Sequence, residues 1–468
     1  MPTPGSSPDL PAEPATPKRQ LTLFDSTCII VGIIIGAGIY ETAPRVARGA
    51  GWWWDAIGLG FLPVAEEAAL WGAVVLFWLA GGLLSLCGAF GYAELATAYP
   101  KEGGDYVYLG RAYGRWAGFL FGWMQLAIVR PGDIVGMAFV FATYAEQIYN
   151  PLAETGFAFT GQLYAATAVA LLTAVNVWGI RQGKWTQNLL TVFKASGLLA
   201  IVAVALFAPR GEPSAAEPSP FPISVALILV LFTYGGWNEM AYVAAEVKRP
   251  KRNIVRALVL GTVAVTLLYL LVNAAFLYAL GYAGLATSDA VAADAVATVF
   301  PEVGARLISA VVCISALGVV NGLIFTGARI SYAVGAEHRA FRVLGKWDRQ
   351  RGTPARALLL QGALAVGLVV VLGSFLDAIL YTAAAIYLFY LATSLAVIVL
   401  RFKEPHVERP YRVTGYPLTT LVFAGVCAFL IYGSIMYKPL LSAVALGIIF
   451  LGLPIYWLTG GSRGLSDR

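Results

Sequence analysis

Long apolar runs are the feature of this sequence that most restricts its fold. About twelve runs of roughly 20 residues follow one another, and a helix of that length crosses the hydrocarbon core of a bilayer. Only 12% of the 468 residues are charged, whereas a soluble domain carries about 25%. The sequence therefore predicts an all-α polytopic membrane protein. We expect spans near residues 23–48, 72–97, 114–147, 162–180, 187–208, 222–247, 255–281, 303–330, 356–374, 377–401, 417–437 and 440–458.

Basic residues gather in alternate loops between these runs. Clusters of Lys and Arg follow the second, fourth, sixth, eighth and tenth runs. By the positive-inside rule both termini lie in the cytoplasm, in a multi-pass protein of the cell (inner or plasma) membrane. The net charge of +6 is a topology signal, so no nucleic-acid partner is expected. Residues 1–20 form a disordered cytoplasmic tail on this reading, and residues 459–468 form a second tail.

Two of the runs are interrupted by glycine near their middle. Gly36 and Gly38 flank Ala37 in the first run, and Gly235 and Gly236 lie in the sixth. Glycine weakens a helix and frees backbone groups, which lipid tolerates only where they line a cavity or find other partners. Close packing through small residues is the alternative for a single interruption. Matching interruptions in two halves of a chain, however, indicate a transporter binding site between inverted repeats.

The spans then divide into two repeats of five with opposite orientation. We expect a single transporter domain over residues 21–458, with repeat one at about 23–208 and repeat two at about 222–401. Two extra helices remain at 417–458. They either pack against the outside or mediate a homo-oligomer, and the sequence leaves both roles open.

The two interruptions offer opposite partial charges to a ligand. A break in the first run exposes N–H groups around Ala37 and Gly38, and helix N-termini bind anions. A break in the sixth leaves carbonyl groups near Phe232, and such ends favour cations. The pair suits a zwitterion, of which an α-amino acid is the simplest. Phe232 is a candidate outer gate and Asn238 a candidate ligand contact, with a core aromatic and an interhelical hydrogen bond as the alternatives.

Ionisable residues inside spans are costly and suggest function. Lys194 lies about 10 Å into the fifth span. Its ammonium either snorkels to the interface or replaces a bound cation between spans one, five and eight, which would argue against sodium coupling. Asp133 follows Arg130 by three residues on one helix face. We favour a structural pair over an acid that faces the site, selects substrate charge or takes up a proton.

The sequence carries no signature of an enzyme. It contains neither a Walker A pattern nor a His-Glu-x-x-His motif, so we expect no catalytic residue, cofactor or metal. All four cysteines lie inside apolar runs and indicate no disulfide framework. Transport must therefore draw on a gradient or on exchange.

Short motifs recur in order along most of the chain. They lie at residues 32–40, 92–95, 100–106, 128–131, 141–144, 194, 232–238, 246–250, 252–253, 320–329 and 408–411. Together they resemble the amino acid–polyamine–organocation superfamily, and within it the L-type amino acid transporter family, a group of permeases.

This resemblance implies a LeuT-type fold with discontinuous helices 1 and 6, and sodium-independent antiport of neutral L-amino acids by alternating access. It places Ile34, Ala37 and Gly38 at the carboxylate, with Gly36 in the same break. It places Phe232 and Gly235 at the ammonium and gate, and Lys194 at a vacated sodium position. A proton-coupled symporter is the runner-up. A cationic amino acid carrier and a sensor that binds amino acids without moving them are less favoured.

The chain also departs from the family pattern. Ala37 stands where the animal members usually have serine, and Asp133 stands where a small or hydroxyl residue is expected. Residues 149–162 contain no cysteine, so we expect no disulfide-linked heavy chain, as in a stand-alone prokaryotic-type carrier. A stretch at about 52–70 lengthens the first outer loop, for which a short cap is one possibility.

Overall fold

The protein is a bundle of helices, described here from a computed structural model. The structure describes residues 21–56, 66–100, 104–152, 155, 158–179, 184–211, 221–238, 247–301, 303–338, 341–348 and 350–459. In chain order the elements are α1 (Leu23–Ile34), α2 (Gly38–Ala56), α3 (Glu66–Ala98), α4 (Asp105–Tyr113), α5 (Arg115–Met124), the π-helical turn η1 (Gln125–Val129), α6 (Arg130–Ile148), α7 (Thr160–Val177), α8 (Lys184–Ala205), α9 (Ile223–Thr233), α10 (Pro250–Thr287), α11 (Val291–Ala297), α12 (Val303–Glu337), α13 (Ala355–Leu372), α14 (Phe375–Lys403), α15 (Leu418–Tyr437) and α16 (Pro439–Leu458).

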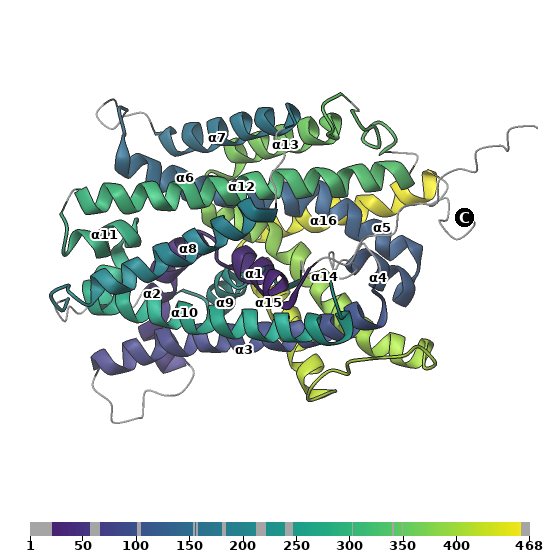
Figure 1. The fold of residues 1–468 in the computed structure, drawn as a ribbon, viewed down its shortest axis with the longest axis horizontal. Helices are drawn as coiled ribbons and strands as arrows, with labels where there is room; N and C mark the ends of the chain where they lie inside the picture. The colour runs from purple at the N-terminus through teal and green to yellow at the C-terminus, as the bar shows by residue number, and fades with distance from the viewer. Residues whose placement is uncertain are drawn as a thin grey trace, which may run out of the picture.

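The polytopic all-α fold is confirmed. Within the described part of the chain, nine helices are long and apolar enough to cross a bilayer, and the bent pair α1–α2 makes a tenth. Two shorter apolar helices, Val192–Ala205 within α8 and α9 itself, lie where the fifth and sixth spans are predicted. Figure 1 shows α3, α10 and α12 running along the long axis of the molecule. The count of twelve spans and the two repeats stay predictions.

Several elements differ from the expected spans. The short helices α4 and α11 lie in predicted loops, since each is too short to stand out as an apolar run. The third predicted span is a continuous path from α5 to α6 that contains a π-helical turn. The expected outer loop at 52–70 is partly helical, because α2 continues to Ala56 and α3 begins at Glu66. Residues 57–65, where a cap was considered, lie outside the described residues.

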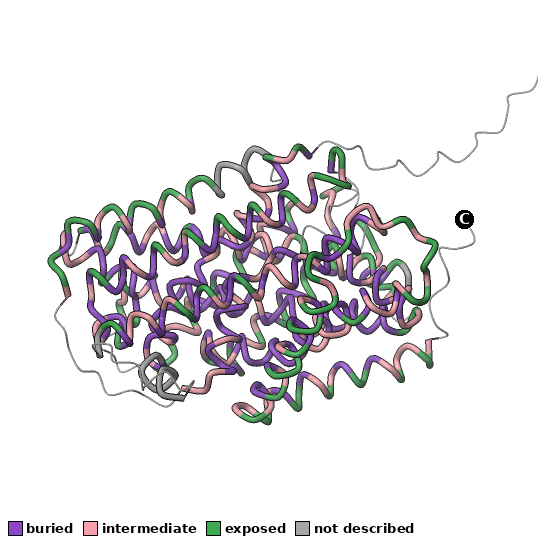
Figure 2. The backbone as a smooth tube through the Cα atoms, turned by 90° about the horizontal axis from the view of Figure 1, so that it is seen from below, coloured by how far each residue is buried: buried purple, intermediate pink, exposed green. Residues whose placement is uncertain are grey.

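Apolar side chains cover the outside of the bundle as well as its centre. Figure 2 shows buried residues along the inner helices and exposed residues on the outer turns of the peripheral ones. On α16, for example, Leu440, Phe450 and Leu458 are all exposed. A soluble protein rarely exposes so large an apolar surface, so this pattern is typical of contact with lipid.

A buried carboxylate ties α3 to α14 at the α4 end of the bundle. Glu94 is only 2% exposed, and its Oε1 accepts a hydrogen bond of 2.9 Å from Arg401 Nε. Arg409 Nε lies 3.5 Å from the same oxygen. The backbone N–H of Val413 donates to Oε2 at 2.7 Å. Glu94 therefore holds the segment after α14 against α3.

A second cluster, next to the first, joins α4 to the end of α14. Glu404 Oε2 accepts hydrogen bonds from Arg111 Nη2 at 3.0 Å and from Tyr99 Oη at 2.9 Å. Partial burial alone would raise the pKa of Glu404, but these two hydrogen bonds lower it below its ordinary value. The α4 end is thus fixed by two adjacent groups of charges.

We expect Glu94→Ala to lower the free energy of unfolding by about 3 kcal/mol, because it removes the buried carboxylate and leaves two partly buried guanidinium groups without it. The thermal unfolding of the purified protein in detergent measures this. Glu408→Ala is the matched control, since Glu408 pairs with Lys251 on the surface with both side chains more than half exposed. Such a pair contributes about 0 to 1 kcal/mol. Equal unfolding temperatures for the two variants would contradict the role of Glu94.

Candidate functional site

The first membrane helix is broken at its glycines. α1 ends at Ile34, α2 begins at Gly38, and the two helices meet at a bend of 53°. Gly36 and Ala37 lie in the break, and a Cβ at Gly36 would meet no side chain within 4 Å. The break therefore places the last carbonyl groups of α1 and the first N–H groups of α2 at the same depth in the bundle.

The sixth predicted span also stops in mid-course. α9 ends at Thr233 and is followed by a turn through Gly235 and Gly236. Gly236 has φ +113°, which L side chains rarely adopt, and a Cβ there would lie 2.4 Å from Ile33 Cγ2. Only glycine fits this close approach of the two breaks. Residues 239–246, in which the second half of the span was expected, lie outside the described residues.

A tyrosine on α10 connects the two breaks. The Tyr269 hydroxyl lies 2.8 Å from the carbonyl oxygen of Ile34 and 3.3 Å from that of Thr233. Its ring is fully buried and packs edge-on against Trp78 and Tyr234. The carbonyl groups at both helix ends therefore share a single donor, which fixes one break relative to the other.

A cavity opens beside the two breaks, with an empty volume of about 1130 Å³ that includes its mouth. It runs along α5 and α6 from Phe121 to Met137, a path of about 24 Å at 1.5 Å per residue. Seven residues predicted for the site line it: Ile34, Gly36, Gly38, Asp133, Phe232, Gly235 and Asn238. Ala37 is fully buried and is not one of the lining residues.

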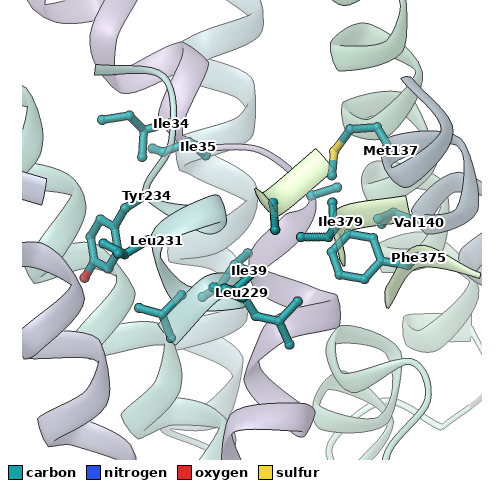
Figure 3. Close-up of a cluster of buried hydrophobic side chains, with 14 of the residues drawn as sticks. Ile34, Ile35, Ile39, Met137, Val140, Leu229, Leu231, Tyr234, Phe375 and Ile379 are labelled. Carbon is teal, nitrogen blue, oxygen red and sulfur yellow. The ribbon is translucent and has the colours of Figure 1, made fainter. Parts of the chain in front are cut away.

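The cavity wall is mainly apolar, with polar groups at intervals. Figure 3 shows the buried side chains around the breaks, with Met137, Phe375 and Ile379 on one side and Ile34 and Leu231 on the other. The lining polar residues include Asp105, Gln125, Arg130, Asp133, Thr233, Asn238, Tyr387 and Tyr390. Arg130 and Asp133 thus both reach the cavity, while their expected pairing stays a prediction. A few polar groups in an apolar cleft are typical of a small-molecule site.

Aromatic side chains pack together beside Phe232, at the end of the cavity next to Gly38 and Met137. A Cβ at Gly38 would lie 3.6 Å from Phe232 Cε1, and the Phe232 ring packs edge-on against Phe375 with centroids 5.9 Å apart. The guanidinium of Arg45 lies over the Phe375 ring, 5.4 Å from its centroid, and Arg45 is paired with Glu41. We call Phe232, Phe375 and Arg45 the aromatic stack.

A hydrogen bond beside the aromatic stack joins the two broken spans. Thr42 Oγ1 on α2 lies 2.8 Å from Thr233 Oγ1 at the end of α9. Because the Thr233 hydroxyl donates to Leu229 O at 2.9 Å, Thr42 is the donor to Thr233. The same end of the cavity is therefore held by a polar contact as well as by aromatic packing.

Lys194 lies behind the break and not in the cavity wall. It is 8% exposed, and its Nζ donates to the carbonyl oxygen of Gly32 at 3.5 Å, in the last turn of α1. The C-terminal end of α1 is thus in contact with the middle of α8. This contact agrees with the interpretation in which the ammonium takes the place of a cation bound to the carbonyl groups of span one. The alternative was a side chain that snorkels to the membrane interface, whereas Lys194 is buried against α1.

Sequence reasoning missed the residues that act across the bundle. Tyr269 lies in the seventh predicted span, Phe375 lies in a predicted loop, and Arg45 lies in the first predicted span beyond the break, where nothing in the local sequence indicates its partner. A hydroxyl-bearing ring in mid-span was the available signal for Tyr269, because a buried Tyr usually finds a hydrogen-bond partner. Gln125 and Tyr390 are further lining residues that were not predicted.

Comparison with known proteins identifies the family. The family model of the amino acid permeases matches residues 21–459. The chain belongs to the amino acid permease family. It is 32% identical over 462 residues to the large neutral amino acids transporter small subunit 2 of Oryctolagus cuniculus, covering 94% of this chain and 80% of that protein. It is also 30% identical over 468 residues to the b(0,+)-type amino acid transporter 1 of Mus musculus, covering 96% and 90%. The resemblance to the L-type family is confirmed, and the chain is a permease and not an enzyme.

We expect Gly38→Leu to abolish ligand binding by this permease, because the added side chain projects between Phe232 and Met137 and fills the cavity at the break. A panel of amino acids tested for thermal stabilisation of the purified protein measures binding, since a ligand that binds only the folded state stabilises it. Gly425→Leu is the control, because Gly425 is exposed on α15 with open space around it. Ligand stabilisation of the Gly38 variant equal to that of the wild type would contradict this placement of the site.

We expect Lys194→Ala to lower the rate of transport by about tenfold or more, because the carbonyl end of α1 loses a charged donor. Uptake into proteoliposomes measures the rate. Lys438→Ala serves as the control, since Lys438 is 42% exposed and pairs with Asp377 at the surface. Full activity in the Lys194 variant would show that the lysine is only a structural contact.

Proposed function

We propose that the protein is a sodium-independent exchanger of neutral L-amino acids that works by alternating access. The observation that carries this proposal is the meeting of two broken helices at one cavity, with Gly38 at the start of α2 and Phe232 near the end of α9 both in its wall. The substrate class follows from the relatives, one of which is named as a large neutral amino acids transporter subunit and another as a b(0,+)-type amino acid transporter.

The chemistry of the breaks supports a zwitterionic substrate. The N-terminal N–H groups of α2 favour the carboxylate, and the carbonyl groups at the end of α9 favour the ammonium. Ile34, Gly36 and Gly38 supply the first wall, and Phe232 and Gly235 supply the second. The side chain of the substrate would then point toward Asp133 and Met137 on α6. An aliphatic or aromatic side chain matches this mainly apolar wall.

The different contacts at the two ends of the cavity support alternating access. The aromatic stack and the Thr42–Thr233 hydrogen bond lie at one end. At the other end the cavity reaches Asp105 on α4 and Tyr390 on α14. The positive-inside rule assigns the α4 end to the cytoplasm of a cell membrane. On this assignment the aromatic stack lies at the outer end, and Phe232 is part of the outer gate.

Lys194 supports independence from sodium. Its ammonium contacts a carbonyl group of α1 next to the break, where a cation could otherwise find oxygen ligands. An ammonium at this position takes the place of a bound metal ion, in keeping with the preference of helix C-termini for cations.

The cysteines support a carrier without a disulfide-linked partner. Cys28, Cys87, Cys313 and Cys427 are all free, and none is exposed. All four lie within helices α1, α3, α12 and α15. None is therefore placed to bond a second chain outside the membrane.

Counterflow in proteoliposomes tests the exchange. We expect uptake of a labelled neutral amino acid to rise about tenfold or more when the vesicles are preloaded with the unlabelled one, because only a loaded carrier returns in an exchanger. Uptake should be the same with and without sodium and should ignore a pH gradient. Uptake that needs a pH gradient but no internal amino acid would favour the proton-coupled symporter. Saturable binding without any uptake would favour a sensor.

A further inference from the structure

We propose that the cavity holds a second binding station, between the central site and the α4 end, that takes the ammonium group of an amino acid on its way to or from the cytoplasm. The station is formed by Gln125, Asp105 and Asn238. It rests on the exchange of amino acids proposed above and on the orientation assigned there.

Gln125 is the residue that points to a ligand. It is only 6% exposed and lines the cavity, yet its Oε1 is buried without a hydrogen-bond partner. An unpaired buried acceptor costs free energy, and native structures rarely keep one without a reason. For a carbonyl oxygen on a cavity wall there is a simple reason: it accepts a hydrogen bond from a donor on the passing ligand.

The backbone around Gln125 is also unusual. Gln125 begins the π-helical turn η1, in which the N–H of Arg130 donates to the carbonyl oxygen of Gln125. Such turns occur mostly as single insertions in α-helices, frequently at functional sites. Here the turn joins α5 to α6 within the wall of the cavity, so that Gln125, Val129 and Asp133 all line it.

The station is distinct from the central site. Met137 marks the level of the central site, because its Cε lies 3.9 Å from a Cβ built at Gly38. Gln125 is twelve residues earlier, a distance of about 18 Å along the helix. A single amino acid held at the breaks is too short to reach it. Arg130 lies between the two levels and supplies a positive charge for a carboxylate.

The other acceptors at this level belong to the same part of the cavity. The fully buried carboxylate of Asp105 accepts hydrogen bonds from Tyr92 Oη and, at 2.7 Å, from Thr393 Oγ1. Asn238 Oδ1 accepts from Tyr390 Oη at 3.2 Å. The Tyr92 and Tyr390 rings pack edge-on with centroids 6.2 Å apart, which brings the two acceptor groups to one end of the cavity.

Three oxygen acceptors with one formal negative charge select a cationic donor. A primary ammonium carries three N–H donors and one positive charge, so the α-ammonium of an amino acid matches this set. Aromatic rings of Phe121 and Phe389, packed 5.6 Å apart beside it, supply an apolar wall for the substrate side chain. The station would thus capture substrate from the cytoplasm before it reaches the breaks.

The test compares the two faces of the membrane in one preparation. In right-side-out vesicles, uptake against external concentration gives the external half-saturation, and efflux from preloaded vesicles against internal concentration gives the cytoplasmic one. We expect Gln125→Leu to raise the cytoplasmic half-saturation for a labelled neutral amino acid about tenfold. The external value should stay within about twofold, because the central site is intact.

Two further variants separate the loss of the acceptor in Gln125→Leu from a general effect on folding. Gln361→Leu removes another buried glutamine whose Oε1 is unpaired, but Gln361 lies on α13 and does not line the cavity, so both values should stay unchanged. Gln125→Glu keeps an acceptor and adds charge, so the cytoplasmic half-saturation should equal or fall below that of the wild type. A tenfold rise in the glutamate variant would overturn the station.

The remaining outcomes separate this inference from the function on which it rests. If Gln125→Leu leaves the cytoplasmic value unchanged, or raises both values together, there is no separate cytoplasmic station. A rise on the external face alone would overturn its placement. If the wild-type protein moves no amino acid in either direction, the proposed function itself fails, whatever the variants do.

Discussion

The structure depends on how the broken end of α1 satisfies its carbonyl groups in the middle of the bundle. An unsatisfied peptide group in lipid costs several kcal/mol, so an interrupted membrane helix needs donors from elsewhere. Val31 O accepts from the N–H of Ile35, Gly32 O from Lys194, and Ile34 O from both the N–H of Gly36 and the Tyr269 hydroxyl. Two of these donors come from α8 and α10, so the break is stable only because those helices pack against it. The gap it leaves is the cavity.

Tyr269 turns two local breaks into one unit. Its hydroxyl lies between the last carbonyl group of α1 and that of α9. Gly236 brings the two broken segments into contact at Ile33. A displacement of either helix end therefore changes the surroundings of the other. A ligand that bridges the start of α2 and the end of α9 acts on the same pair of elements. Binding and movement are thus linked through a few contacts and do not require a path across the whole bundle.

The sequence predicted the parts of this arrangement that depend on backbone freedom. Apolar length predicted the spans, and the glycines predicted the break between Ile34 and Gly38 and the end of α9 at Thr233, because glycine changes local backbone preference wherever it stands. The contacts of Tyr269, Phe375 and Gln125 were not predicted, since each depends on which helices become neighbours. Helix α4 was missed for a related reason: nine residues with polar ends leave no apolar run to detect. Lys194 is intermediate, because its charge suggested a partner but only packing identifies Gly32.

The two ends of the cavity differ in what holds them, and this difference indicates which elements move. At the outer end, as assigned above, closure depends on the aromatic stack, in which Phe232 of α9 and Arg45 of α2 pack against Phe375 of α14. Such contacts can separate without leaving a buried charge unpaired. At the α4 end, Glu94 links α3 to Arg401, Arg409 and Val413, and breaking that cluster would strand charges in a site of low dielectric. Opening to the outside is therefore easiest if α1, α2 and α9 move as the unit joined by Tyr269, while α3 and α14 stay together as the frame against which they move.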